Sequence, residues 1–378
     1  MRQSGCKGRW PVVELSTTAS VIFLQPITSC NLDCSYCYLP QRFVRRRMSD
    51  KVADSVARAV RAWSDTHPVR VVWHGGEPLT LGVPGFTELL ERFHAGRNHI
   101  RHAVQTNATL IDDAWCDAFL RHRVDVTVSL DGPQGFNRQR TTRGGEESFA
   151  AALRGVSKLR GHGIPYSAIA VVRDTDPERA AELYDWFAAL GCRTLGVNIV
   201  ERKGTHSKAS VDDDQVVAFW AALAARWRAD QRVRIREFDH ACRYLAAELS
   251  GQSEDRALVP RDPMPMISWD GEVTVLGPDL AGFSSARLGA LTVGNVVDGA
   301  LTELIRHAAE TTWVSEALEG IEACRTNCDH FAYCLGGQPA NKYFETGRFD
   351  VTETTYCRNS KKRLMEGLIR SVQSSRVR

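Results

Sequence analysis

Short apolar, β-branched runs alternate with longer amphipathic stretches from about residue 20 to about residue 235. Continuous apolar runs of this length are typical of strands that are buried on both faces. Regular alternation of strands and helices predicts a parallel sheet with crossover helices. The pattern fits a doubly wound sheet and a partial barrel equally well. The six predicted strands are Val21–Gln25, Val69–Trp73, Ala103–Thr106, Asp125–Ser129, Ser167–Val172 and Thr194–Val200.

The amphipathic stretches between these runs carry signals for helix starts. Ser49 can cap a helix whose apolar side chains, from Val52 to Trp63, fall on one face. Another helix is predicted from Asp212 to Trp227, after the last strand. The remaining helix starts are marked by a capping or first-turn residue: Asp112, Ser148 and Pro177.

A change of pattern divides the chain, whose 378 residues are enough for about two domains. Three prolines between positions 260 and 265 punctuate a boundary. Beyond them, Asp270-Gly271 predicts a hairpin turn, and Asp298 predicts the cap of a helix through His307. We expect an N-terminal extension over residues 1–19, a strand–helix unit over 20–235, a bridging segment over 236–262 and a cysteine-rich unit over 263–378.

Composition and charge exclude several functional classes. Lys and Arg total 48 against 45 Asp and Glu, and this near balance gives no electrostatic case for nucleic acid. The basic run Arg45-Arg46-Arg47 is read as a solvated loop that could at best help an acidic peptide to dock. No apolar stretch approaches the roughly 20 residues of a membrane helix. The eleven cysteines are an odd number and favour metal ligation in a reducing cytoplasm over a disulfide framework.

Cys30, Cys34 and Cys37 are spaced C-x3-C-x2-C directly after the first predicted strand. Three thiols in one loop can hold three irons of a [4Fe–4S] cluster and leave the fourth iron open to a small molecule. The alternatives are a structural zinc site and ordinary buried thiols. A zinc site needs a fourth ligand, and the next histidine is as far away as His67. We therefore favour the cluster.

A second group of cysteines lies near the C-terminus. Its four thiols fit either a four-cysteine zinc site or a fully ligated [4Fe–4S] cluster. These candidate ligands are Cys324, Cys328, Cys334 and Cys357. Four isolated cysteines are read as small buried hydrophobic residues: Cys6, Cys116, Cys192 and Cys242.

Polar residues follow the predicted strands, where a parallel sheet places its ligands. The run Gly75-Gly76-Glu77-Pro78 lets the backbone approach a ligand closely, and the Glu77 carboxylate can accept hydrogen bonds from an ammonium group. Side chains suited to a ribose or a carboxylate follow at Thr106, Asn107, Ser129 and Asp131. For Asp131 the alternative is turn chemistry with Gly132. Arg140 and Arg143 offer guanidinium forks for a carboxylate, or are merely surface charges.

These motifs together resemble the radical S-adenosylmethionine (SAM) enzymes, because Tyr36 precedes the third cysteine and Gly75–Pro78 is similar to the family's GGEP motif. The resemblance implies an α/β fold, a partial (β/α)6 TIM-like barrel. It also implies SAM on the open iron, a 5′-deoxyadenosyl radical and an electron donor such as flavodoxin or ferredoxin. The implied SAM-binding residues are Tyr36, Gly75, Gly76, Glu77, Pro78, Thr106, Asn107, Ser129, Asp131, Arg140, Arg143 and, near the adenine, Asn198.

The cysteine-rich tail resembles a SPASM domain, which carries auxiliary clusters. The full pattern has seven cysteines, but this chain lacks the two expected around Met266–Asp279 and has Gln338 where another would stand. All the ligands of the second auxiliary cluster are retained. The resemblance therefore implies two [4Fe–4S] clusters, one that binds SAM and one fully ligated auxiliary cluster for electron transfer or structure.

Within this family the chain is most similar to the cyclophane-forming peptide maturases of the GrrM/OscB type. The long segment Gly336–Arg358 carries the resemblance most specifically. It implies a ribosomally made precursor peptide and a C–C crosslink between an aromatic ring and a β-carbon. Asp279 is then a candidate base, or only a turn residue after Pro278.

Other chemistries remain open on the same scaffold: thioether formation, epimerisation and sulfatase-type oxidation of Cys or Ser. Sulfatase-maturing relatives usually keep all seven auxiliary cysteines, which counts against the last of these. A rival of another class is a non-catalytic interaction protein whose tail holds zinc.

Overall fold

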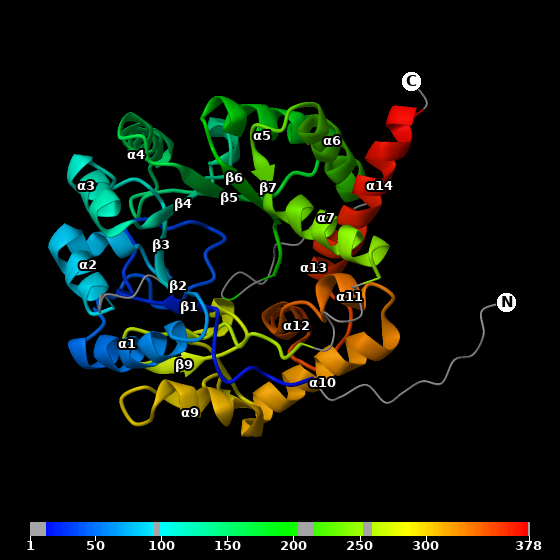
Figure 1. Cartoon of the computed structure of the whole chain (residues 1–378). Coiled ribbons are helices and arrows are strands. Elements are labelled where there is room, and N and C mark those ends of the chain that lie inside the picture. Colours follow the sequence, from blue (N-terminus) through cyan, green and yellow to red (C-terminus); the bar gives the residue numbers. More distant parts are fainter. Residues whose placement is uncertain (1–12, 94–98, 203, 205–214, 252–258, 377–378) are drawn as a thin grey trace.

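The computed structural model describes residues 13–93, 99–202, 204, 215–251 and 259–376. Seven parallel strands lie side by side in sequence order at its centre (Figure 1). All six strands predicted from the apolar runs are present, and a short seventh follows them. They are β1 (Val21–Leu24), β2 (Val69–Trp73), β3 (Ile100–Thr106), β4 (Asp125–Ser129), β5 (Tyr166–Val172), β6 (Thr194–Ile199) and β7 (Arg234–Ile235).

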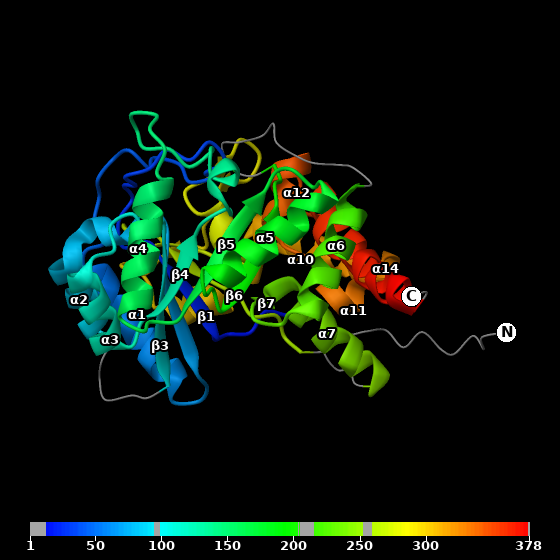
Figure 2. The same cartoon turned by 90° about the horizontal axis from the view of Figure 1, so that it is seen from above.

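Helices connect consecutive strands and cover the outer side of the sheet (Figures 1 and 2). Strands β1 to β7 are arranged across the sheet in the same order as along the chain. This part of the sheet therefore has no point at which the strand order reverses, as a doubly wound sheet has. The arrangement is an open strand–helix array. Its helices are α1 (Asp50–Ser64), α2 (Gly82–Glu91), α3 (Asp113–His122), α4 (Phe149–Gly161), α5 (Pro177–Ala189) and α6 (Gln215–Ala229).

The predicted helix starts at Ser49 and Asp112 are confirmed by their capping bonds, and Pro177 begins α5 as predicted. The Ser49 side chain accepts from Val52 N at 3.4 Å, and Asp112 accepts from Trp115 N at 2.9 Å. Ser148 precedes α4 but makes no capping bond with its side chain. The predicted start of α6 at Asp212 lies outside the described residues. Short helical turns complete this half: η1 (Pro78–Leu81) and η2 (Gln134–Phe136).

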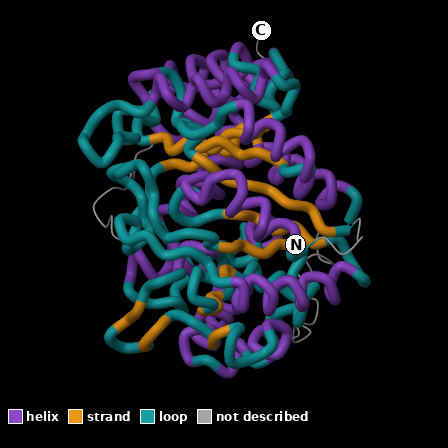
Figure 3. The backbone as a smooth tube through the Cα atoms, turned by 90° about the vertical axis from the view of Figure 1, so that its left-hand side faces the viewer, coloured by secondary structure: helices purple, strands orange, loops and turns teal. Residues whose placement is uncertain are grey.

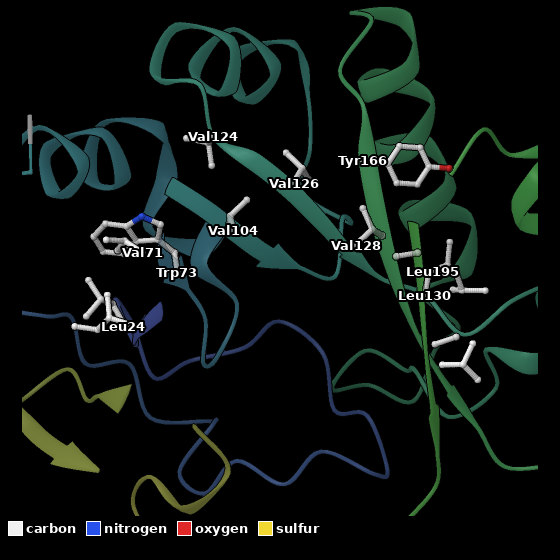
Figure 4. Close-up of a cluster of buried hydrophobic side chains, with 14 of the residues drawn as sticks. Leu24, Val71, Trp73, Val104, Val124, Val126, Val128, Leu130, Tyr166 and Leu195 are labelled. Carbon is white, nitrogen blue, oxygen red and sulfur yellow. The ribbon is translucent and has the colours of Figure 1, made fainter. Parts of the chain in front are cut away.

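The core lies between the sheet and its helices. Figure 4 shows apolar side chains from neighbouring strands, among them Val71, Val104 and Val126, gathered in one cluster. Trp73 is fully buried, and its indole N–H donates to His102 Nδ1 at 3.2 Å. Burial of apolar area on this scale is the main force that holds the strands in register.

The C-terminal part extends the same sheet. β8 (Met266–Ile267) pairs parallel with β1, β9 (Glu272–Thr274) pairs antiparallel with β8, and β12 (Gly294–Asn295) pairs with β9. Gly271, with φ of 94°, stands at the predicted hairpin turn between β8 and β9. A separate two-stranded sheet is formed by β10 (Ser284–Ser285) and β11 (Gly289–Ala290). In Figure 3 the strands run through the middle of the molecule and helices cover them.

One predicted helix start in this part is wrong. α9 begins at Leu301 after Ala300, so Asp298 is not its cap. Asp298 instead belongs to a turn, in which its N–H donates to Asn295 O at 3.1 Å. The sequence analysis also gave no helix to the bridging segment, where α7 (Arg236–Leu249) forms.

Further helices pack the tail against the strand–helix array. The Trp220 indole N–H of α6 donates to Asn359 O at 2.9 Å, and the C-terminal helix α14 lies along α6 (Figures 1 and 2). These elements are α9 (Leu301–Arg306), α10 (Thr312–Asn327), α11 (Phe331–Cys334), α12 (Pro339–Thr346), α13 (Thr355–Cys357), α14 (Arg363–Arg376), the turns η3 (Pro278–Leu280) and η4 (Ala308–Glu310), and the π-helical turn η5 (Arg358–Lys362).

Among the described residues, no helix has both the length and the apolar character that crossing a membrane requires.

Candidate active site

The three-cysteine loop follows β1 and is held in place by backbone hydrogen bonds. Cys30 N donates to Arg42 O at 2.9 Å, and Cys37 N donates to Cys34 O at 3.0 Å. Asp33 N donates to Thr141 O at 2.8 Å, which ties the loop to the segment after β4. The loop is therefore fixed at the carboxyl ends of the strands.

A cavity of about 200 Å³ opens beside this loop. Its wall combines the three thiols with residues from the ends of β2 to β6, as expected for a site at the carboxyl edge of a parallel sheet. The lining residues are Cys30, Leu32, Cys34, Tyr36, Cys37, Tyr38, Leu39, His74, Gly76, Glu77, Gln105, Thr106, Asn107, Ser129, Arg140, Ile169, Val171, Asn198, Ile199, Val200 and Glu201.

Gly76 lets the strand end approach the cysteine loop. A Cβ atom there would lie 2.6 to 2.7 Å from the carbonyl oxygens of Ile27, Thr28 and Ser29, and φ is 66°. Glu77 N donates to Ser29 O at 2.9 Å. Only glycine satisfies both the contact and the backbone angle. Gly75 and Pro78, predicted with them, are outside the cavity lining and shape the turn.

Glu77 is a buried carboxylate that connects three segments. Its oxygens accept from Leu79 N at 3.1 Å, Thr106 Oγ1 at 2.7 Å and Asn107 N at 2.7 Å. Burial raises the pKa of Glu77, while the three donors oppose that rise. A carboxylate with three such donors keeps capacity for one more partner on the cavity side.

Asn107 places its side chain beside the first cysteine. Its Nδ2 donates to Asn31 Oδ1 at 2.8 Å and lies 4.0 Å from Cys30 Sγ. Its Oδ1 accepts from Thr109 N at 3.0 Å. The amide is therefore locked in one orientation.

Tyr36, Asp131 and Arg140 form a buried polar triad. Tyr36 donates its hydroxyl proton to Asp131 Oδ2 at 2.6 Å and accepts from Arg140. Asp131 Oδ1 accepts from Val171 N at 3.0 Å and lies 3.8 Å from Arg140 Nη1. Burial raises the pKa of Asp131, and the Arg140 guanidinium opposes this. Tyr36 and Arg140 reach the cavity, whereas Asp131 anchors them from behind.

Arg143 and Asn198 have different surroundings. Arg143 donates from Nε at 3.0 Å and from Nη2 at 2.6 Å to Cys30 O, so it clamps the cysteine loop from outside the cavity. Asn198 lines the cavity, and its Oδ1 accepts from Arg236 Nη2 at 2.7 Å. Ser129 also lines the cavity, as predicted for a ligand-facing residue.

Asp279 is connected to the cavity through a tyrosine. It is 7% exposed in η3 and hydrogen-bonds the Tyr38 hydroxyl, whose oxygen lies 2.7 Å from His74 Nε2. Tyr38 and His74 line the cavity, whereas Asp279 lies behind them. Neither Tyr38 nor His74 was predicted from the sequence, although Tyr38 follows Cys37 directly and His74 immediately precedes the Gly-Gly pair.

The four tail cysteines share a second cavity, of about 240 Å³. Among the described residues, no group of three or more Cys, His, Asp or Glu side chains is arranged to hold a single metal ion. Four thiols spread around a cavity are instead the donor set that a fully ligated [4Fe–4S] cluster needs. Lys342, Lys361 and Lys362 line the same cavity. Asp329 and Glu353 line it as well, so the lysines leave a small excess of positive charge that suits an anionic occupant.

Burial affects the thiols of both sites. It raises the pKa of Cys30 to about 12 and that of Cys357 to about 12. These thiols therefore carry protons when no metal is bound, and the protons must leave when iron binds.

The isolated cysteines differ among themselves. Cys116 and Cys192 are buried, as predicted. Cys242 is exposed, so its assignment as a buried hydrophobic residue is wrong, because α7 turns this face away from the sheet. Cys6 lies outside the described residues.

Comparisons with known proteins place this geometry in a family. Residues 24–187 match the family model of the Radical SAM superfamily. An uncharacterized protein of Synechocystis sp. is 29% identical over 94% of this chain and 92% of its own length. The serine-type anaerobic sulfatase-maturating enzyme of Bacteroides thetaiotaomicron is 25% identical over 86% and 84%.

Solved structures agree over nearly the whole chain. Native anSMEcpe with bound AdoMet is 25% identical and superposes with a TM-score of 0.74 over 94% of this chain and 99% of that one. Streptococcus suis SuiB bound to its precursor peptide SuiA shares the fold, at 17% identity and a TM-score of 0.65 over 90% and 76%. The family match begins at the last residue of β1 and includes the three-cysteine loop. Residues 24–187 therefore belong to the Radical SAM superfamily, and the protein is an enzyme whose cofactors are SAM and a [4Fe–4S] cluster.

Proposed function

We propose that this enzyme modifies a ribosomally made precursor peptide by joining an aromatic ring to a β-carbon, as the cyclophane-forming maturases do. The observation that carries the proposal is the position of the segment Gly336–Arg358. Its Lys342, Tyr356 and Cys357 line the tail cavity. Its Asn341 donates to Glu201, which lines the active-site cavity. The most specific sequence feature of the chain thus connects the two cysteine sites.

A peptide substrate agrees with the relatives. SuiB has been solved with its precursor peptide, and several relatives are sulfatase-maturating enzymes. We infer a strand–helix barrel over residues 20–235, a bridging segment over 236–262 and a SPASM-like unit over 263–378. An electron donor of the flavodoxin or ferredoxin type would serve the first cluster.

The residues present fit two clusters. Cys30, Cys34 and Cys37 would hold the cluster that, with SAM, supplies a 5′-deoxyadenosyl radical for hydrogen abstraction. The tail site would supply an electron acceptor. Its ligands would be Cys324, Cys328, Cys334 and Cys357.

The proposed product determines which atoms and electrons the peptide must lose. One β-carbon loses a hydrogen atom and bonds to the ring of an aromatic residue two positions earlier. The ring then loses one electron and one proton to recover aromaticity. Asp279 is the candidate base. Because it lies behind the cavity wall, its route to the substrate passes through the hydroxyl of Tyr38.

Sulfatase-type oxidation is the second candidate, because sulfatase-maturating enzymes are among the relatives. The chain has no cysteine between Cys242 and Cys324, so it lacks the two that such enzymes usually carry in this region. This difference favours the cyclophane. The zinc-binding interaction protein considered at first is set aside, since the protein is an enzyme.

Coexpression with a candidate precursor peptide, chosen from small open reading frames next to the gene, tests the proposal. Each crosslink should make the peptide lighter by about 2 Da, because one hydrogen is lost at each joined carbon. Replacing the aromatic residue with leucine should block the change, and β-deuterium should appear in 5′-deoxyadenosine.

Two other results would redirect the assignment. An unchanged mass with solvent deuterium at an α-carbon would mean epimerisation. A link that reductive desulfurisation removes would mean a thioether.

A further inference from the structure

Cationic side chains lie in and beside the tail cavity, and they are buried to different extents. Lys342 is only 3% exposed, and its Nζ donates to Gly320 O at 2.7 Å and to Cys324 Sγ at 3.3 Å. Lys361 is half-buried, with its Nζ 5.5 Å from the centre of the Tyr333 ring. Arg261, also half-buried, donates to Leu335 O at 2.7 Å and to Gly337 O at 2.6 Å.

The charge of Lys342 is not balanced by a carboxylate. Within the described part of the chain, its hydrogen-bond partners are one carbonyl and one thiol, Gly320 O and Cys324 Sγ. A buried ammonium group is costly unless a negative charge is close to it. An anionic group inside the cavity would supply the missing negative charge.

Lys362 provides an internal contrast. It lines the same cavity, but it forms an ion pair with Glu353 and its side chain is 33% exposed. Its charge is therefore already balanced and screened by solvent.

We propose that Lys342, helped by Lys361, raises the reduction potential of the tail cluster. This inference rests on the proposed function, which places a [4Fe–4S] cluster on the four tail thiols. Such a cluster is negatively charged, and it gains one more negative charge when it is reduced. A buried cation therefore stabilises the reduced form more than the oxidised form, and low polarity strengthens the effect. A higher potential is what an electron acceptor for the substrate requires.

The test is a redox titration of the full chain, followed by EPR after anaerobic reconstitution. Cys30, Cys34 and Cys37 are replaced with alanine in every sample, so that the signal comes from the tail cluster alone. The variants are Lys342→Met and Lys361→Met, and the matched control is Lys362→Met. Methionine keeps most of the side-chain length and removes the charge.

Lys342→Met should lower the equilibrium constant for reduction at least about tenfold, which is about 59 mV for one electron. Lys361→Met should shift the potential in the same direction. Lys362→Met should shift it by less than about a third of that amount, because Glu353 balances its charge.

The outcomes separate the inference from the proposed function. If the background protein shows no tail-cluster signal, or binds zinc there, the proposed function fails. If the cluster forms but its potential stays the same in both Lys342→Met and Lys361→Met, the inference is wrong. Equal shifts in all three variants would also overturn the inference, since any positive charge near the cavity would then have the same effect whether or not it is buried. Should Lys342→Met lose its cluster, Lys361→Met decides between these outcomes.

Discussion

At the scale of single residues, Gly76 is the most constrained position of the active site. Replacing it with alanine would press a methyl group against three carbonyl oxygens and would strain a left-handed backbone angle. We expect Gly76→Ala to cost at least about 1–2 kcal/mol of stability, and to abolish SAM cleavage by displacing the cysteine loop. Thermal unfolding and 5′-deoxyadenosine formation measure the two effects.

Gly135 is the matched control for this substitution. An added Cβ there meets nothing within 4 Å. Gly135→Ala should keep both stability and SAM cleavage. If Gly76→Ala were as active as Gly135→Ala, the close approach between this turn and the cysteine loop could not matter for the site.

Local motifs predicted the cluster cysteines and the Gly-Gly-Glu turn, because spacing within a few residues defines their chemistry. The polar contacts behind the cavity were not predictable in that way. Asp279 meets Tyr38 only after the C-terminal part folds onto the first strand. In the sequence Lys342 looks like an ordinary surface lysine, and only the folded structure shows its hydrogen bond to Cys324 Sγ. Asp131, predicted as a ligand or a turn residue, serves instead as the anchor of Tyr36 and Arg140.

At the scale of elements, the joint between α14 and α6 fixes the end of the tail. Gly367 allows this contact, because a Cβ there would lie 2.6 Å from Trp220 Cβ and 2.9 Å from Ala221 N. We expect Gly367→Ala to destabilise the protein by about 1–3 kcal/mol through overpacking. Because α14 follows α13, which carries Cys357, through the short turn η5, this variant should lose iron from the tail site more readily than from the three-cysteine site.

The control is Gly161→Ala at the end of α4, where an added Cβ meets nothing within 4 Å. Unfolding curves and iron release during mild heating give the comparison. Equal iron loss from both sites in Gly367→Ala would show that the joint does not support the tail in particular.

Secondary structure was predictable where the pattern repeats. The first six strands of the strand–helix array have largely buried, β-branched sequences, so each predicted run is present with ends that differ by at most three residues. The tail was harder to predict, because α9, α11, α12 and α13 are only three to eight residues long and are too short for a clear apolar period. Aspartate often caps helices, but the Asp298 N–H donates to Asn295 O in a turn. The helix therefore starts three residues later.

At the scale of the whole molecule, the two halves are built around one continuous sheet. β8 of the tail pairs with β1, directly before the three-cysteine loop. The tail therefore extends the sheet at the edge strand from which the three-cysteine loop follows. The sequence separated these regions at a group of prolines and could not show that their strands pair, because pairing across more than two hundred residues leaves no local pattern.

The central claim is that the chain holds two [4Fe–4S] clusters, one on three cysteines and one on four. The most direct measurement is the iron and zinc content of the anaerobically reconstituted protein, together with two variants. One variant replaces Cys30, Cys34 and Cys37 with alanine. The other replaces the four tail ligands Cys324, Cys328, Cys334 and Cys357.

We predict about eight irons per chain for the unaltered protein and about four for each variant, with SAM cleavage lost only in the first. Exchanging exposed Cys242 for alanine should change nothing. About four irons with one zinc in the unaltered protein, or about twelve irons, would contradict the account.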